Sequence, residues 1–331
     1  MKLGIKIIHP GIYTTIQDEG RFGYESLGFS PAGAMDYESY YLANQLIGND
    51  LNTPVLEMTL KGAKFQVTSS VTIGTAGADM PLLINDEEYK VGAAIDLIKG
   101  DVVEFGVARK GVRTYVAFLG GFDIKQELGS YSTHSRSKIG GFGRPLQPFD
   151  VVDLNGGLAR HGYKVVTKDI DTSNVIRVVK GQQYDYFDEK NLDNFFHSEY
   201  TVSKDSDRMG YRLDGESVEA ESHDIISETI LFGSIQIPKN GKPIILLSDR
   251  QTAGGYTKIA TIAKVDIQKI AQKKPGDKIQ FKLIEVEEAV ELYKEHLRAI
   301  KNKEFIGTTK EFSNVRRPVS ERIHTLIGGN S

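Results

Sequence analysis

The chain has 331 residues, of which 40% are hydrophobic and 26% are charged, and its formal net charge at pH 7 is −3. This composition is typical of a soluble globular protein with about two domains, and so small a net charge excludes a basic field that would gather nucleic acid or a membrane surface. The lack of cysteine excludes disulfide scaffolds, thiolate nucleophiles, Cys-ligated zinc and iron–sulfur clusters. No apolar leader follows Met1 and no apolar run approaches about 18 residues, so we expect a cytoplasmic protein.

Short β-type runs separated by turn residues make up the first half of the chain. Glycine, with 34 residues, is more frequent than usual and marks many of these turns. A helix interrupts the pattern over 36–47, with Asp36 as a candidate N-cap and Gly48 at its end. The spacing favours a barrel or a sandwich over alternating strands and helices. Strands are expected over 63–67, 71–74, 95–98, 102–107 and 113–118.

The second half repeats this style after a polar segment at 168–174, which is the best candidate for a linker. A short helix is expected between Asp266 and Pro275, and a longer one over 287–301, where apolar residues recur every three or four positions. Strands are expected over 175–179, 229–237, 244–247 and 279–286. The predicted domains are a Gly-rich β domain at 1–168, a β-barrel domain at 174–286, and a C-terminal helix and tail at 287–331.

Most sequence motifs of well-known enzyme classes are absent. There is no Gly-x4-Gly-Lys-Ser/Thr phosphate loop, no Gly-x-Gly-x-x-Gly after a strand, no Gly-x-Ser-x-Gly nucleophile elbow and no His-Glu-x-x-His zinc motif. The seven histidines are never spaced as metal ligands, so no metal site is predicted in this chain. A biotin-carrying lysine would need Met-Lys-Met, which does not occur, so any biotin would be carried by another chain.

Several segments are instead dense in glycine, arginine, aspartate and hydroxyl side chains. Glycine lets main-chain N–H groups approach a ligand closely, and arginine binds a carboxylate or phosphate through two hydrogen bonds. Such loops suit a small anionic substrate, although the same residues could simply build the corners of a barrel. The segments are 14–21 with 31–36 and 43–44; 120–121 with 129–133 and 140–144; 206–211; and 249–256.

Motifs from these segments occur in a fixed order along most of residues 1–285. They include Thr15-Ile16-Gln17-Asp18-x-Gly20-Arg21, Gly33-Ala34-Met35-Asp36, Leu56-Glu57, Thr75-x-Gly77-Ala78-Asp79, Arg113-x-Tyr115, Ser206-Asp207-Arg208-Met209-Gly210-Tyr211, Gln236-Ile237-Pro238 and Asp249-x-Gln251-Thr252-x-Gly254-Gly255-Tyr256. In this order they resemble the family called allophanate hydrolase subunit 2, also known as the biotin-dependent carboxyltransferase family, the C subunit of 5-oxoprolinase or KipI antagonist.

This resemblance implies a cyclophilin-like, mainly β architecture with two barrel domains. Stand-alone bacterial members are similar to one component of an ATP-dependent 5-oxoprolinase, which opens the lactam of 5-oxo-L-proline to L-glutamate. The implied partners are the B subunit of that enzyme (a KipI-like protein, allophanate hydrolase subunit 1) and its A subunit. The implied cofactor is ATP with Mg²⁺ in the complex.

Two other functions stay open. Fused relatives form the carboxyltransferase half of urea carboxylase, in which carboxybiotin delivers CO₂ to urea. Other members are described as antagonists of a kinase inhibitor, so the chain could instead bind a KipI-like partner without catalysis.

Candidate site residues follow from what lactam activation needs, namely cationic contacts for phosphoryl and carboxylate oxygens and carboxylates that steer water, protons or Mg²⁺. In one motif the resemblance breaks down, since the family's Gly-Ser-Arg-Ser-Thr is here Gly-Ser-Tyr131-Ser-Thr, and Arg136 is the candidate substitute for the missing arginine. Each candidate could also have a purely structural role, as a cap, a turn residue or a buried ion pair. The candidate catalytic residues are Asp249, Asp36 and Glu57, and the candidate substrate- or phosphate-binding residues are Arg21, Arg113, Arg136, Arg208, Asn44, Ser132, Gln251, Thr252 and Tyr256.

Overall fold

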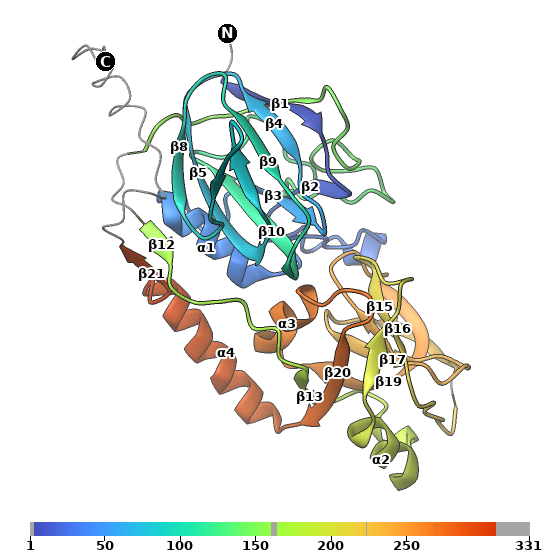
Figure 1. Ribbon diagram of the computed structural model, residues 1–331. Helices are drawn as coiled ribbons and strands as arrows, with labels where there is room; N and C mark the ends of the chain where they lie inside the picture. The colour runs from blue at the N-terminus through green and yellow to red at the C-terminus, as the bar shows by residue number, and fades with distance from the viewer. Residues whose placement is uncertain (1–2, 160–163, 223, 309–331) are drawn as a thin grey trace, which may run out of the picture. The chain divides into compact units, whose positions relative to one another are not determined.

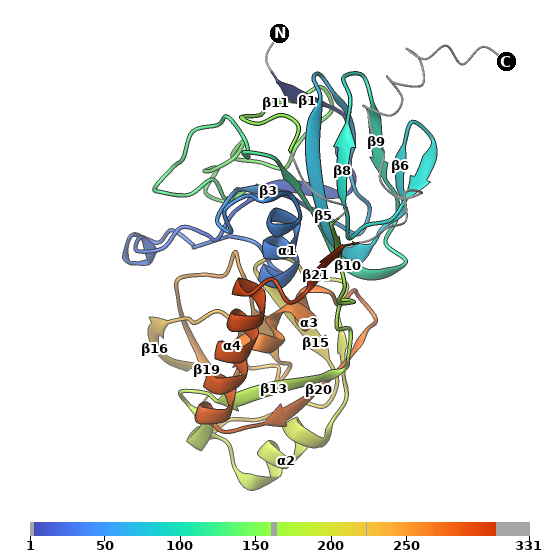
Figure 2. The same cartoon turned by 90° about the vertical axis from the view of Figure 1, so that its left-hand side faces the viewer.

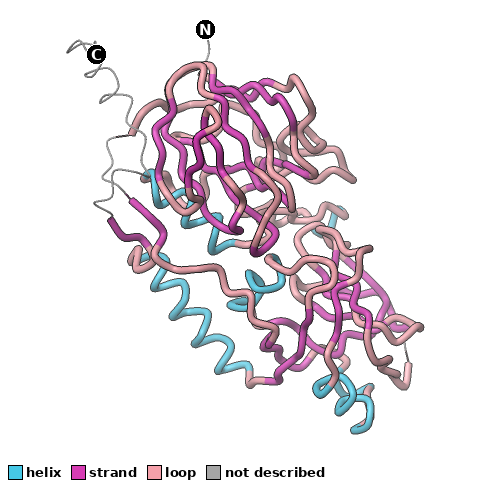
Figure 3. The backbone as a smooth tube through the Cα atoms, in the orientation of Figure 1, coloured by secondary structure: helices cyan, strands magenta, loops and turns pink. Residues whose placement is uncertain are grey.

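The computed structural model describes residues 3–159, 164–222 and 224–308 (Figure 1). The chain divides into two compact units. Unit 1 contains Met1–Glu19, Tyr37–Asp169 and the chain from Lys303, and unit 2 contains Gly20–Asp36 and Ile170–Asn302. Strands far outnumber helices in both units, so the predicted mainly β class is confirmed (Figure 3).

The described residues of unit 1 form two main sheets, a small two-stranded sheet and one helix. Its elements are β1 (Gly4–His9), β2 (Tyr13–Gln17), α1 (Tyr37–Ile47), β3 (Val55–Thr59), β4 (Lys64–Val67), β5 (Val71–Asp79), β6 (Leu82–Ile84), β7 (Glu87–Tyr89), β8 (Ala94–Leu97), β9 (Val102–Phe105), β10 (Lys110–Phe118), β11 (Val151–Asp153), β12 (Lys164–Val166) and β21 (Ile306–Thr308). The strand orders are β11-β1-β4-β9-β6-β7, β2-β3-β10-β5-β8 and β12-β21.

The two main sheets of unit 1 share one hydrophobic core. Phe65 from β4 packs against Phe118 from β10, with 5.9 Å between the ring centroids. Helix α1 packs on β5 and β10 (Figure 2). A Cβ on Gly74 of β5 would lie 2.2 Å from the carbonyl oxygen of Ala43, so only glycine allows the helix to come this close to the strand.

Unit 2 is a closed barrel with short helices around it. Its strands are β13 (Val175–Lys180), β14 (Tyr200–Val202), β15 (Gly210–Asp214), β16 (Asp224–Thr229), β17 (Ser234–Ile237), β18 (Ile244–Leu246), β19 (Ala253–Ile262) and β20 (Lys278–Leu283). The order is β13-β20-β14-β15-β18-β17-β19-β16, and a further antiparallel pairing of β13 with β19 closes seven of these strands into a ring. Strand β16 is attached outside the ring, to β19.

The helical elements of unit 2 are η1 (Glu25–Leu27), η2 (Tyr184–Tyr186), α2 (Glu189–His197), η3 (Lys264–Asp266), α3 (Ile267–Ala271) and α4 (Val286–Lys301). Helix α2 begins after Asp188, whose side chain accepts a hydrogen bond from the main-chain N–H of Asn191 at 2.8 Å. It buries Phe195, which stacks on Phe281 with 4.7 Å between the ring centroids. Helix α4 packs against η3 and β13.

The helices expected at 36–47 and 287–301 are confirmed to within a residue, as α1 and α4. The single strand expected over 229–237 is wrong, because β16 ends at Thr229 and β17 begins at Ser234 after a turn in which Gly233 has a φ of +85°. The strand expected over 279–286 ends at Leu283, since α4 begins at Val286. Helix α2 was not predicted, and the tail beyond residue 308 lies outside the described residues. In the described part of the chain, no helix is long and apolar enough to cross a membrane.

Candidate functional site

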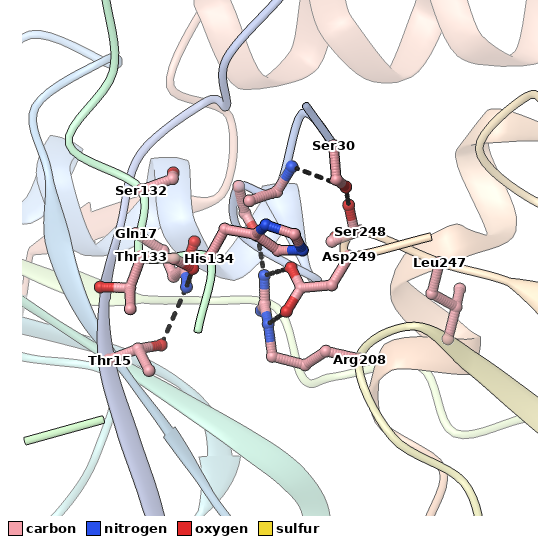
Figure 4. Close-up of polar contacts among 12 residues, drawn as sticks. Thr15, Gln17, Ser30, Ser132, Thr133, His134, Arg208, Leu247, Ser248 and Asp249 are labelled. Atoms are coloured by element: carbon pink, nitrogen blue, oxygen red, sulfur yellow. Dashed lines mark hydrogen bonds and ion pairs between the residues drawn. The ribbon is translucent and has the colours of Figure 1, made fainter. Parts of the chain in front are cut away.

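Two of the predicted site residues, Arg208 and Asp249, form a buried ion pair in unit 2 (Figure 4). The Nε and Nη2 atoms of Arg208 lie 3.1 Å and 2.9 Å from the two carboxylate oxygens of Asp249. Arg208 Nη2 also donates to the carbonyl oxygen of Gly33 at 2.7 Å. Both residues are more than nine-tenths buried, so each fixes the orientation of the other.

Main-chain contacts hold the loops that carry this pair. Arg208 shortly precedes β15, and Asp249 follows β18. The main-chain N–H of Asp249 donates to the carbonyl oxygen of Arg208 at 2.9 Å. The carboxylate of Asp207 accepts from the main-chain N–H groups of Met209 and Gly210, at 2.7 Å and 3.3 Å. The turn that presents Arg208 is therefore fixed from both sides.

A groove of about 440 Å³ lies on the outer face of the barrel. Its lining includes Asp207 and Met209, which are the sequence neighbours of Arg208. Side chains alternate along β15 and β18, so that Tyr211 and Ile245 enter the barrel core while their neighbours face the groove. Two predicted site residues, Gln251 and Tyr256, line it. Its complete lining is Asp205, Asp207, Met209, Gly210, Arg212, Gln236, Pro238, Asn240, Ile244, Leu246, Gln251, Gly254, Gly255 and Tyr256.

A buried lysine on β19 was not predicted as a site residue. Lys258 is 1% exposed, and its Nζ atom lies 2.5 Å from Glu228 Oε1 and 3.5 Å from Gln183 Oε1. The hydrogen bond from Lys258 holds the pKa of Glu228 below its ordinary value. On the sheet, Lys258 is directly opposite Gln236 of β17, which lines the groove. A lysine directly before the mainly apolar end of β19 is the sequence signal that could have revealed this cluster.

In unit 1 the structure brings two other predicted residues together. Glu57 on β3 and Arg113 on β10 are both buried, with 3.7 Å between Arg113 Nε and Glu57 Oε1. The other carboxylate oxygen of Glu57 accepts from the hydroxyl of Tyr115 at 2.8 Å. Glu57 and Tyr115 are opposite each other in the β3–β10 ladder. This carboxylate therefore has fixed partners inside the sheet.

Ser132 belongs to a buried cluster around Asp18 in unit 1. The carboxylate of Asp18 accepts from the hydroxyls of Ser130 at 2.6 Å and Ser132 at 2.5 Å, and from the main-chain N–H of Tyr131 at 2.7 Å. The aromatic side chain of Tyr131 packs against the core of unit 1. Asp18 belongs to the first of the ordered motifs but was not a predicted site residue, and it is the residue that orders the 130–132 loop.

Another set of hydrogen bonds in unit 1 is centred on Gln17, the residue before Asp18. Its Nε2 atom donates to the hydroxyl of Thr15 at 2.9 Å and to the carbonyl oxygen of Thr133 at 3.1 Å (Figure 4). These bonds attach strand β2 to the same loop that Asp18 holds.

The remaining predicted residues lie in other surroundings. Asn44 of α1 donates to the carbonyl oxygen of Thr53 at 2.9 Å and accepts from Asn49, which is a structural arrangement. Asp36 accepts from Gln272 Nε2 at 2.8 Å. Arg21 is fully buried, Arg136 is exposed, and the carbonyl oxygen of Thr252 accepts from the main-chain N–H of Ile230.

The three candidate carboxylates do not gather into a metal site. Within residues 3–159, 164–222 and 224–308, no group of three or more His, Cys, Asp or Glu side chains is arranged to hold a metal ion. Asp249, Asp36 and Glu57 are instead bonded to Arg208, Gln272 and Tyr115. No step is therefore assigned to a Mg²⁺ ion held by these carboxylates.

Sequence comparison finds curated relatives over nearly the full length of the chain. It is 34% identical over 296 residues to the 5-oxoprolinase C subunit of Escherichia coli, which covers 89% of this chain and 96% of that protein. It is 35% identical over 281 residues to the 5-oxoprolinase C subunit of Haemophilus influenzae, which covers 84% of this chain and 90% of that protein.

Structure comparison gives a similar picture. The crystal structure of the K. lactis urea amidolyase matches with a TM-score of 0.86 and 28% identity, covering 97% of this chain but only 21% of that one. The family model described as carboxyltransferase domain, subdomain A and B, matches residues 27–283. The ordered motifs, the two β units and these matches agree, and the chain belongs to the carboxyltransferase domain family.

Proposed function

We propose that this chain is the C subunit of a 5-oxoprolinase and helps to open 5-oxo-L-proline to L-glutamate. The observation that carries the proposal is the match to two proteins of that name over 90% or more of their length. A match of this extent means that both units of the chain have counterparts in those proteins. The required partners are a KipI-like B subunit and an A subunit, and ATP with Mg²⁺ would be bound by the assembled complex.

The chemistry explains why ATP is needed. A lactam is a poor electrophile, so its carbonyl oxygen would first attack the γ-phosphate of ATP, and ADP would leave. Water would then add to the activated carbon and the ring C–N bond would break, with the released nitrogen taking up a proton. The resulting acyl phosphate would react with a second water molecule, which gives the carboxylate of glutamate and inorganic phosphate. This chain would contribute binding and orientation of the substrate.

The groove of unit 2 is the part of this chain best suited to that role. Its volume of about 440 Å³ is large enough for a small cyclic acid. Tyr256 offers an aromatic wall and Gln251 a carboxamide, and both come from the same motif as Asp249. Arg212 supplies a cationic group at the groove for the substrate carboxylate.

A second candidate function is the carboxyltransferase half of a biotin-dependent enzyme. The specific observation in its favour is the TM-score of 0.86 to the K. lactis urea amidolyase. Under this alternative the biotin would be carried by another chain, because this sequence has no Met-Lys-Met.

The two functions are separated by reconstitution. The chain is purified with its two partner proteins, mixed with ATP, Mg²⁺ and 5-oxo-L-proline, and L-glutamate is measured. We expect glutamate only when all three proteins are present. Glutamate formation that continues without this chain would overturn the proposal, and transfer of the carboxyl group of added carboxybiotin to urea would favour the alternative.

A further inference from the structure

One polar side chain in the groove has no hydrogen-bond partner among the described residues. Gln236 of β17 is 5% exposed and lines the groove of unit 2. Its Nε2 atom is buried and makes no hydrogen bond to any described residue. Buried carboxamides in proteins are nearly always hydrogen-bonded, so an unpaired one in a groove wall is a candidate contact for a ligand that enters the groove.

The surroundings of Gln236 fix its place. Gly254 faces it so closely that a Cβ there would lie 3.1 Å from Gln236 Nε2. On the neighbouring strand, Lys258 is opposite Gln236 but is held by Glu228 and Gln183. The ammonium group of Lys258 therefore already donates its hydrogen bonds to these two residues. The carboxamide of Gln236 lies in the wall of the groove.

We propose that the carboxamide of Gln236 recognises the ring amide of a lactam through a pair of hydrogen bonds. A primary carboxamide carries an N–H donor and a C=O acceptor on one edge. A lactam ring holds its own N–H and C=O on the same side, so the two edges pair, whereas a linear peptide amide points these groups in opposite directions. Rotation by about 180° around the Cγ–Cδ bond of Gln236 exchanges its amide nitrogen and oxygen, so either atom can face the ligand.

This inference rests on the proposed function, because it names the chemical group of 5-oxo-L-proline that the groove would recognise. A cyclic ureido group, as in the biotin ring, presents the same donor and acceptor edge. The shared chemistry is a cis N–H and C=O in a five-membered ring. The ligand arms of the test distinguish the two sources.

Binding is measured by calorimetry on the assembled complex of all three proteins without ATP, so that no turnover occurs. The probes are 5-oxo-L-proline, L-proline, which keeps the ring and carboxylate but lacks the ring carbonyl, and 2-imidazolidinone as the ureido probe. Gln236→Leu removes the paired edge at similar volume. Gln280→Leu, an exposed glutamine on β20 of the same barrel, is the matched control.

We expect Gln236→Leu to weaken binding of 5-oxo-L-proline by about tenfold or more, to leave L-proline binding unchanged and to keep the melting temperature of wild type. If Gln236→Leu weakens binding of 2-imidazolidinone more than binding of 5-oxo-L-proline, the result would support the paired hydrogen bonds and assign them to a ureido ligand. Wild-type binding of the lactam no tighter than that of L-proline, or unchanged selectivity in Gln236→Leu, would overturn the inference.

A second variant covers the case in which Gln236→Leu does not fold. Gln236→Glu preserves the shape but presents only acceptors at neutral pH, and the same loss of lactam selectivity is expected. If the wild-type complex makes glutamate and Gln236→Glu and Gln236→Leu leave KM unchanged, the inference fails while the proposed function stands. If the complex makes no glutamate but binds the lactam through Gln236, the proposed function fails while the inference stands.

Discussion

Arg208 and Asp249 form a two-point ion pair in the interior of unit 2, with both carboxylate oxygens of Asp249 bonded to the guanidinium. The two residues are 41 positions apart in the sequence, and each comes from a different motif. A buried pair of this kind is costly to break, because the remaining partner keeps an uncompensated charge. It therefore links the stability of the barrel to the integrity of both motif loops.

Arg208→Ala is expected to abolish glutamate formation and to lower the free energy of unfolding by about 3–5 kcal/mol, because Asp249 is left buried without its counter-charge. Thermal unfolding monitored by circular dichroism checks the stability change. Lys242→Ala removes an exposed ion pair with Asp214 and is the matched control, with an expected melting temperature equal to that of wild type. A stable but inactive Arg208→Ala protein would contradict the structural part of this prediction and favour a direct role in ligand binding.

Tyr256→Ala is expected to raise KM for 5-oxo-L-proline in the reconstituted complex by about tenfold, since it removes an aromatic wall of the groove. The side chain is 41% exposed, so the melting temperature should not change. Tyr186→Ala, a tyrosine of equal exposure in η2 outside the groove lining, is the control. Steady-state kinetics on the two variants test this prediction. Equal changes in KM for both variants would show that Tyr256 is not part of the substrate site.

Sequence periodicity was sufficient for the long helices of this fold. Helices α1 and α4 were predicted to within a residue because their apolar positions repeat every three or four residues. Helix α2 was missed, since nine residues give too few repeats and its helical form depends on packing Phe195 against Phe281. The closure of the barrel pairs Val178 with Ile262, a contact between distant segments that no local pattern encodes.

The site was only partly predictable for a similar reason. Motifs identified Arg208, Asp249, Gln251 and Tyr256, but they could not show that the first two bond to each other while the last two line a groove. Gln236 belonged to the motif Gln236-Ile237-Pro238 but was not predicted as a site residue. Its importance lies in a carboxamide nitrogen that no described residue pairs, which is visible only once the neighbours have been placed.

The ion pair of Lys258 with Glu228 should make part of the stability depend on pH. The pKa of Glu228 in the folded protein lies below its ordinary value of 4.5, because Lys258 donates a hydrogen bond to the carboxylate. A group whose folded pKa is depressed contributes stability that is fully present above the unfolded pKa and is lost as the pH falls through the folded pKa. Glu228→Gln should therefore have a lower melting temperature than wild type at pH 7, and the difference should shrink as the pH falls below 4.5. A difference that stays constant over this range would mean that the pair does not contribute through its charge.

Gly254→Ala is expected to narrow the groove and weaken binding of 5-oxo-L-proline. The new methyl group would lie 2.8 Å from the Cδ1 atom of Ile230 and 3.1 Å from Gln236 Nε2, so both side chains must move. Both atoms are at the far ends of flexible side chains, so this shift should cost little stability. Gly157→Ala is the matched control, since its methyl group would meet only the carbonyl oxygen of Ser70, at 4.0 Å. Calorimetric titration and thermal unfolding of both variants test the prediction. Unchanged lactam affinity in Gly254→Ala would show that the ligand does not reach the Gly254–Gln236 contact, because a displaced Gln236 could no longer present its amide edge in the same place.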